Sequence, residues 1–174
     1  MNHGKYICHP KKPIMKTTNR FSIIMAIVLL SFSIHSCNKN KEIRLKTITL
    51  YVDTDNINQQ NKDSTHISNF GQALGVSNQD FTTDVEMGED ILWIGVSSSS
   101  PETDKVYITR IKHKKGKKFF KNLELKGKKK VRGKVKDKGF KEGDSMKYSV
   151  KFTVIKKGNS NKQFIIDPKL RMTN

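Results

Sequence analysis

One stretch near the C-terminus constrains the fold more than any other part of the chain. Within residues 145–157, apolar side chains occupy every second position: Met146, Tyr148, Val150, Phe152 and Val154. Successive side chains of a β-strand point to opposite faces, so this spacing places all five on one face of a strand. We therefore expect a long strand with one face in a core and the other, with Lys147, Ser149, Lys151 and Thr153, towards solvent.

Shorter strand patterns recur along the chain from residue 43 onward. They cover residues 43–53, 81–87, 91–97, 105–112, 129–137 and 163–167, and residues 119–125 form either a short strand or a packed loop. Turns rich in Gly, Asn and Asp separate them, and no segment after residue 42 shows a sustained helical period with caps. We predict an all-β fold over residues 43–174: an antiparallel β-sandwich of immunoglobulin-like type with seven or eight strands.

Details of these strands make the prediction testable. In residues 43–53, Ile43 and Leu45 fall on the opposite parity to the apolar residues that follow, which predicts a bulge near Lys46 or Thr47. Residues 113–118 read as a Lys/Gly turn. Pro168, which has no N–H for a ladder, is expected to end the last strand.

The strand expected at residues 91–97 is the most apolar of the set. It contains Trp93, the single tryptophan of the chain. We expect Trp93 to anchor the core.

The N-terminal part has the organisation of a secretory signal. Lys16 and Arg20 precede an apolar run of 14 residues, 21–34. This run is shorter than the roughly 20 apolar residues that span a bilayer. An export signal is favoured, with a membrane-spanning helix as the weaker alternative. Met15 is a second plausible start, because residues 1–14 add nothing that a signal needs.

The apolar run ends in Ile34-His35-Ser36-Cys37. This junction resembles a lipobox, the type II signal peptidase site, with Ile34, Ser36 and Cys37 at the expected positions and His35 where a small residue is usual. The resemblance implies that residues 1–36 are removed, that Cys37 is lipidated, and that residues 37–42 form a tether. An ordinary secretory signal with a coincidental cysteine is the alternative.

Lipidation of Cys37 implies a location. Two or more acyl chains anchor a protein stably, whereas one binds only marginally. We expect a protein held on a bacterial cell-envelope membrane by its lipid, with the outer membrane favoured.

Charge divides the chain into unlike parts. The formal net charge is +18; residues 38–104 carry a net −6 and residues 105–157 a net +17. Such asymmetry suggests an anionic partner for the basic part. Only five of the 34 basic residues are Arg, and lysines on solvent-facing strand positions also keep a sheet soluble. A solvated face and a polyanion site are both open.

The basic part suggests one binding surface. Side chains 130, 132, 134 and 136 of a strand point to one side, so these positions form a cationic ridge. The candidate residues for anionic-ligand binding are Lys114, Lys115, Lys117, Lys118, Lys128, Lys130, Arg132, Lys134 and Lys136. Such a surface suits phosphate or sulfate groups without specificity. Phe119 and Phe120 are the only aromatics near for stacking bases, so lipopolysaccharide or acidic polysaccharide is favoured over nucleic acid.

Catalytic and cofactor motifs are weak. Only His66 and His113 follow the signal segment, both in polar sequence, and the serine run after Gly95 does not make Gly-x-Ser-x-Gly. We assign no catalytic residue, metal ligand or cofactor.

The alternative function is an envelope-polymer hydrolase that uses Asp53, Asp55, Glu89 and Asp90. Such an enzyme needs two carboxylates about 5–9 Å apart.

Short motifs between residues 48 and 168 carry a second resemblance. They are Phe70-Gly71-Gln72, Asp80-Phe81-Thr82-Thr83, Trp93-Ile94-Gly95-Val96-Ser97-Ser98 and Ile166-Asp167-Pro168. Together they resemble the DP-EP family of small bacterial β-proteins. That family has no assigned activity, so the resemblance implies a β fold and no reaction.

Overall fold

The computed structural model describes residues 44–157 and 161–173, and within them the chain forms ten strands and no helix. The predicted all-β class is confirmed. No helix in the described ranges is long and apolar enough to cross a membrane. The predicted signal segment, Cys37 and the tether lie outside the described residues.

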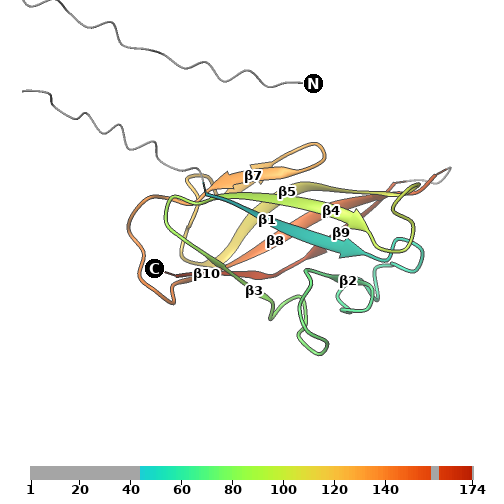
Figure 1. Ribbon diagram of the computed structural model, residues 1–174, viewed down its shortest axis with the longest axis horizontal. Helices are drawn as coiled ribbons and strands as arrows, with labels where there is room; N and C mark the ends of the chain where they lie inside the picture. The colour runs from blue at the N-terminus through green and yellow to red at the C-terminus, as the bar shows by residue number, and fades with distance from the viewer. Residues whose placement is uncertain (1–43, 158–160, 174) are drawn as a thin grey trace, which may run out of the picture. The chain divides into compact units, whose positions relative to one another are not determined.

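The strands form two sheets (Figure 1). The first has the order β2-β1-β4-β7 and contains β1 (Leu45–Val52), β2 (Ser68–Asn69), β4 (Asp90–Ser97) and β7 (Val131–Lys134). The second has the order β3-β10-β8-β5-β6 and contains β3 (Thr82–Val85), β5 (Lys105–Gly116), β6 (Glu124–Lys126), β8 (Ser145–Ile155) and β10 (Lys169–Met172). Its sixth strand, β9 (Lys162–Ile166), pairs with β8.

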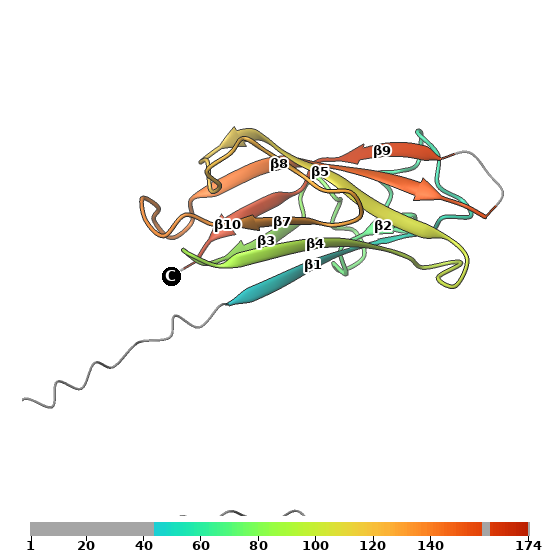
Figure 2. The same cartoon turned by 90° about the horizontal axis from the view of Figure 1, so that it is seen from above.

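The two sheets pack face to face, with β1 and β4 in one layer and β8 and β9 in the other (Figure 2). Trp93 of β4 is 1% exposed and meets Tyr148 of β8 edge-on, with ring centroids 6.0 Å apart. The prediction that Trp93 anchors the core is confirmed.

The alternation in β8 is confirmed on its inner face, where all five apolar side chains from Met146 to Val154 are buried. On the outer face, however, Ser149 and Thr153 are also buried. The reason is that β8 lies inside its sheet, with β5 on one edge and β9 and β10 on the other.

The prediction of a purely antiparallel fold is wrong at two strand pairs. β1 pairs with β4 in parallel, and β10 pairs with β3 in parallel. After β1 and β2 the chain crosses to the six-stranded sheet as β3 and returns as β4 beside β1. A crossover of this kind is what a parallel pair requires. The two strands that the sequence did not predict, β2 and β10, raise the count in the described residues above seven or eight.

The predicted bulge near Lys46 is wrong. β1 pairs with β4 without a register shift from Leu45 to Val52. Leu45 therefore lies on the outer face and is 51% exposed. The inward position is occupied by Lys46, whose ammonium donates to the backbone oxygen of Asp84 at 2.6 Å and pairs with Glu89 at 3.4 Å.

The predicted turn at residues 113–118 is wrong, because β5 continues to Gly116. Two register shifts against β8, between Ile108 and Arg110 and between His113 and Lys115, let the strand keep pairing while its side-chain parity changes. In the next segment, Phe119 and Phe120 are buried as expected, whereas Leu123 is 50% exposed.

Pro168 ends β9 but not the last strand. The chain resumes as β10 along the same edge of β8, at Ser145–Lys147. Between the two strands, the Pro168 carbonyl accepts the backbone N–H of Tyr148 at 3.1 Å. A proline contributes a carbonyl but no donor to a ladder, so it is tolerated at this break.

Candidate anion-binding site

All nine basic residues predicted to bind an anionic ligand are exposed. They fall into two groups. One group, Lys114, Lys115, Lys117 and Lys118, lies at the end of β5 and in the loop after it. The other, Lys128, Lys130, Arg132, Lys134 and Lys136, lies in the loop before β7 and along β7.

β7 presents its cations on one face. Arg132 and Lys134 are exposed, whereas Val131 and Gly133 between them are buried. Val135 continues the buried face just after the strand. The cations therefore project from the outer surface of the four-stranded sheet, at its edge.

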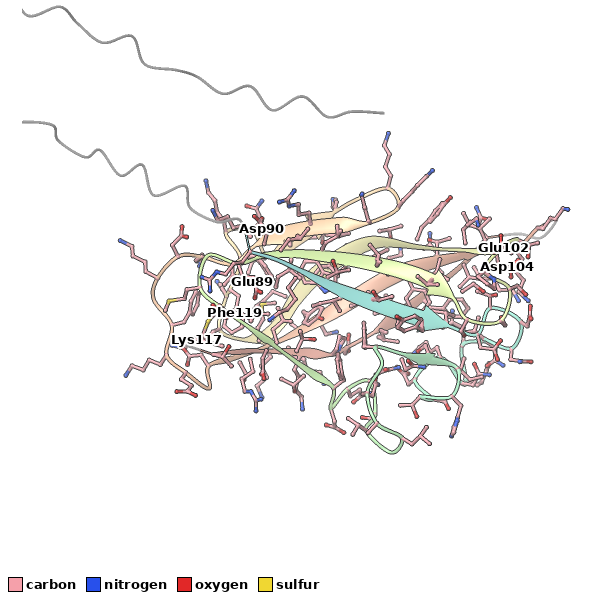
Figure 3. The ribbon with its side chains drawn as sticks, in the orientation of Figure 1. Glu89, Asp90, Glu102, Asp104, Lys117 and Phe119 are labelled. Carbon is pink, nitrogen blue, oxygen red and sulfur yellow. The ribbon has the colours of Figure 1, made fainter. Side chains whose placement is uncertain are left out.

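Backbone contacts bring the two groups together at one end of the domain. Lys136 donates its backbone N–H to the Phe119 carbonyl at 2.9 Å, and Phe120 bridges to Val135. Figure 3 shows Lys117 and Phe119 at the same end as Asp90, which is opposite Lys134 in the ladder. The loop after β5 and the end of β7 therefore lie side by side, and the nine residues of the two groups are called the basic band below.

Carboxylates pair with part of the basic band. Three of the nine side chains form ion pairs: Lys114 lies 3.7 Å from Asp167, Lys117 lies 3.9 Å from Asp144, and Arg132 lies 3.3 Å from Asp90. The side chains of the other six are exposed. Surface pairs at these distances contribute little, about 0–1 kcal/mol, so the positive charge of the nine side chains remains largely available at the surface.

The sheet also adds cations that the sequence analysis did not assign to the site. Lys115 of β5 stands opposite Lys147 of β8, which stands opposite Lys169 of β10. Only Lys169 has a carboxylate partner in the described part of the chain, Asp80 at 3.3 Å. The alternation in residues 145–157 already placed Lys147 on the outer face, but its neighbours come from strands that the sequence does not pair.

The acidic residues of the hydrolase alternative lie at opposite ends of the domain. Figure 3 shows Glu89 and Asp90 at one end and Glu102 and Asp104 at the other. Asp55 belongs to the second end, because Ser100 Oγ donates to its Oδ2 at 3.2 Å. The eight residues of β4 separate the two ends, which corresponds to roughly 20 Å or more. Carboxylates from the two ends are therefore too far apart to share one glycosidic bond.

Each end uses its carboxylates to hold local structure. Glu89 is buried and accepts the backbone N–H of Glu86 at 3.0 Å, beside its ion pair with Lys46. Asp53 accepts from the side-chain amide of Asn56 at 2.7 Å, and this hydrogen bond is the main reason that the pKa of Asp53 lies below its usual value.

Asp104 shows the same pattern among buried hydroxyls. Its pKa is lowered chiefly by a hydrogen bond from Thr54, whose hydroxyl also lies 2.8 Å from Ser97 Oγ. Among the residues that the structure describes, no three His, Cys, Asp or Glu side chains gather into a possible metal site.

Comparisons with known proteins bear on the fold only. No family model and no curated protein matches the sequence. Among solved structures, the chain is similar to an inclusion body protein (PixA) from Burkholderia cenocepacia J2315, with 13% identity and a TM-score of 0.51. The match covers 78% of this chain and 99% of that one. At this identity the likeness describes the arrangement of strands.

Proposed function

We propose that the chain is a lipid-anchored protein of the bacterial cell envelope, held by Cys37, whose β domain binds anionic envelope polymers through the basic band. The observation that carries the binding proposal is the exposure of all nine predicted residues, of which Lys114, Lys117 and Arg132 also lie within 4 Å of a carboxylate. Export and lipidation rest on the Ile34-His35-Ser36-Cys37 junction. Lipopolysaccharide phosphates and acidic polysaccharides are the anions nearest to such an anchor.

The composition of the band favours binding by charge density. Eight of its nine members are Lys, and a Lys ammonium is a point charge on a flexible stem, whereas an Arg guanidinium offers a fixed planar fork. Binding of this kind releases counterions from the polymer, so its affinity falls steeply as salt concentration rises.

Burial of the nearby aromatics weakens the case for nucleic acid. Phe119 is 0% exposed and Phe120 is 5% exposed. Neither ring is available to stack on a base, which is the usual second component of single-strand binding.

The finer fold assignments belong to the same proposal. We propose that the two facing sheets are an immunoglobulin-like sandwich, to which β2 and β10 are additions. The DP-EP resemblance is compatible with the fold, since Trp93–Ser97 lies on β4 and Asp167-Pro168 forms the break between β9 and β10. An experimental structure of a DP-EP protein, compared strand by strand, tests both assignments.

The binding proposal is tested by replacing Lys130, Arg132, Lys134 and Lys136 together with Gln. Because these side chains are exposed, the variant should keep its circular dichroism spectrum and its melting temperature. Its binding to lipopolysaccharide and to heparin should weaken alike, and the salt dependence of both should become less steep.

The matched control removes four positive charges where β8 stops, through Lys105→Gln, Lys156→Gln, Lys157→Gln and Lys162→Gln. This control should bind both polymers nearly as the unmodified protein does. Equal losses in the two variants, or no binding at low salt by any form, would refute the proposal and leave a basic surface that only keeps the sheet soluble.

A further inference from the structure

A second basic surface crosses the outer face of the six-stranded sheet, on residues that do not belong to the basic band. Lys126 of β6 stands opposite Arg110 of β5, Arg110 opposite Lys151 of β8, and Lys151 opposite Ile165 of β9. The row therefore runs across four neighbouring strands, a distance of about 15 Å at the usual strand spacing. Three of its four positions are cationic.

This arrangement opposes stability. Like charges directly opposite each other on neighbouring strands are destabilising, and Arg110 and Lys151 have that relationship. In the described part of the chain, Glu124 is the acidic partner of the row, 3.8 Å from Arg110 and 3.1 Å from Lys126. Lys151 has no carboxylate partner within the same residues. Because this row of like charges does not stabilise the fold, its position points to a role in binding an external anion.

The row lies in a shallow groove that is widely open to solvent. It consists of two open hollows of about 300 and 540 Å³, and both are lined by Lys151 and Gln163. The smaller cavity extends over Arg110 and Lys126, and the larger one extends past Ile165. The loop after β1 forms a wall, because Gln59 donates its side-chain amide to the Gln163 carbonyl at 2.8 Å.

Two polar atoms beside this groove lack a hydrogen-bond partner among the described residues. They are Arg110 Nε and Asp167 Oδ1, both buried, and Asp167 lines the larger cavity. Leaving a polar group buried and unpaired is unfavourable, and such groups are few in a folded protein. An anionic ligand that hydrogen-bonds to the Arg110 guanidinium and offers a hydroxyl to Asp167 would give both atoms a partner.

We propose that this groove binds an anionic oligosaccharide, with Arg110 and Lys151 holding its acidic groups. The guanidinium of Arg110 suits a carboxylate or a phosphate in two-point contact. The amides of Gln59 and Gln163 suit sugar hydroxyls. Ile165 is 42% exposed and offers an apolar contact to the C–H face of a sugar ring.

The residues that line the groove also favour an oligosaccharide over nucleic acid. Phe164 lines the larger cavity but is 2% exposed and stacks on Phe152, so no free ring is offered to a base. None of the groove residues belongs to the nine of the basic band. The groove therefore makes stereochemical demands on its ligand, whereas the band acts through charge density.

The test uses the full processed chain and isothermal titration with tetragalacturonate, a galactose tetramer without carboxylates, and a phosphorylated oligosaccharide. The double variant Arg110→Gln/Lys151→Gln should lose about tenfold or more in affinity for the acidic tetramer, since it loses two charge-assisted contacts. The uncharged tetramer should bind weakly to every form. Comparing the two acidic probes shows whether the groove prefers carboxylates or phosphates.

The matched control is Lys105→Gln/Lys112→Gln, which removes two exposed positive charges from β5 at positions that do not line the groove. It should change the affinity for the tetramer by no more than about twofold, given the weak reach of exposed charges at physiological salt. The four-residue Gln variant of the basic band should keep the tetramer affinity, which separates this proposal from the first.

The Arg110→Gln/Lys151→Gln variant should also melt no lower than the unmodified protein, because it relieves a repulsion between neighbouring strands. If it fails to fold, Lys151→Gln alone replaces it. Equal losses in the groove variant and the control variant, or no binding of either acidic probe by the unmodified protein, would overturn the proposal.

Discussion

The indole N–H of Trp93 donates a hydrogen bond to the hydroxyl of Tyr148 at 3.3 Å and thereby joins the two sheets through the centre of the core. Both side chains are almost fully buried, at 1% and 0% exposed. Phe120 packs edge-on against the same indole, with ring centroids 5.6 Å apart. Buried Trp and Tyr usually find a partner for their polar atoms, and here the Tyr148 oxygen accepts the N–H of Trp93.

This contact predicts that Trp93→Ala costs about 3–5 kcal/mol of unfolding free energy, because it leaves a large cavity and an unpaired hydroxyl. Urea denaturation monitored by circular dichroism measures the loss. Tyr51→Ala is the control, since Tyr51 lies on the outer face of β1 and is 41% exposed; it should cost much less. Fluorescence emission typical of a water-exposed tryptophan in the folded protein would contradict the buried position of Trp93.

The second prediction concerns alkaline pH. Burial raises the pKa of Tyr148 far above its usual value. Its folded-state pKa therefore exceeds its unfolded-state pKa, so the neutral phenol stabilises the fold fully below about pH 10 and less as pH rises above that. Tyr148→Phe should lower stability at pH 8 by about 1–3 kcal/mol, since the Trp93 donor loses its acceptor. The variant should also lose less stability between pH 9 and 11 than the unmodified protein, and parallel curves would count against the assignment.

The third prediction concerns the spacing between the sheets at two glycines. A Cβ on Gly95 would lie 2.7 Å from the backbone oxygen of Val106 and 2.5 Å from its Cγ1. A Cβ on Gly133 would first meet Leu125 Cδ1, at 2.5 Å, which is the far end of a flexible side chain. Gly95→Ala should therefore cost about 1–3 kcal/mol, the range for overpacking a core, and Gly133→Ala should cost clearly less. Thermal melting of the two variants side by side decides between this order and its reverse.

Local patterns in the sequence were sufficient for most strands. The alternation from Met146 to Val154 gave β8 its inner face, and the apolar run around Trp93 gave β4. β10 was missed because a proline usually stops a strand, and the sequence does not reveal that Tyr148 supplies a donor to its carbonyl. The outward position of Leu45 was missed because apolar parity alone suggested a bulge, whereas a continuous ladder to β4 turned Lys46 inward to an ion pair with Glu89.

Pairing between distant strands was beyond what local patterns contain. Neither parallel pair can be read from residue spacing, because both depend on where the chain crosses between the sheets. The same limit applies to binding surfaces. The Lys-rich segments 114–118 and 128–136 are visible as runs, but the row of Lys126, Arg110 and Lys151 exists only because three strands align in register.

The fourth prediction concerns the two-point contact between Asp84 of β3 and Arg171 of β10. Arg171 donates to Asp84 through Nε at 2.8 Å and Nη2 at 3.0 Å, and this hydrogen bonding is the main reason that the pKa of Asp84 is lowered. Because the pKa of Asp84 is lower in the folded state, its ionised carboxylate stabilises the fold above the unfolded-state pKa of about 3.9. This stabilisation is lost as pH falls through the folded-state pKa. Asp84 is roughly half exposed, so Asp84→Asn should cost at most about 1 kcal/mol at pH 7.

The difference between Asp84→Asn and the unmodified protein should shrink as pH falls below about 4, where the carboxylate itself becomes neutral. Arg171→Lys keeps the charge but removes the two-point contact, and it should lose part of the same stability. Denaturation midpoints at pH 7, 4 and 3 give the comparison. If the stability difference between Asp84→Asn and the unmodified protein stays constant across this range, the contact with Arg171 does not act through the charge of Asp84.

The last prediction concerns the anchor. If Cys37 receives the lipid, Cys37→Ala should abolish labelling by radioactive fatty acid and move the protein from the membrane fraction to the soluble fraction. The β domain should fold as before, because its first strand begins at Leu45 and its core contains no cysteine. Cys8→Ala is the control: Cys8 precedes the predicted cleavage point, so labelling should be unchanged. One acyl chain alone binds membranes only marginally. A strain that attaches fewer acyl chains to Cys37 should therefore release part of the protein from the membrane fraction. Continued labelling of the Cys37→Ala protein would refute lipidation at this position.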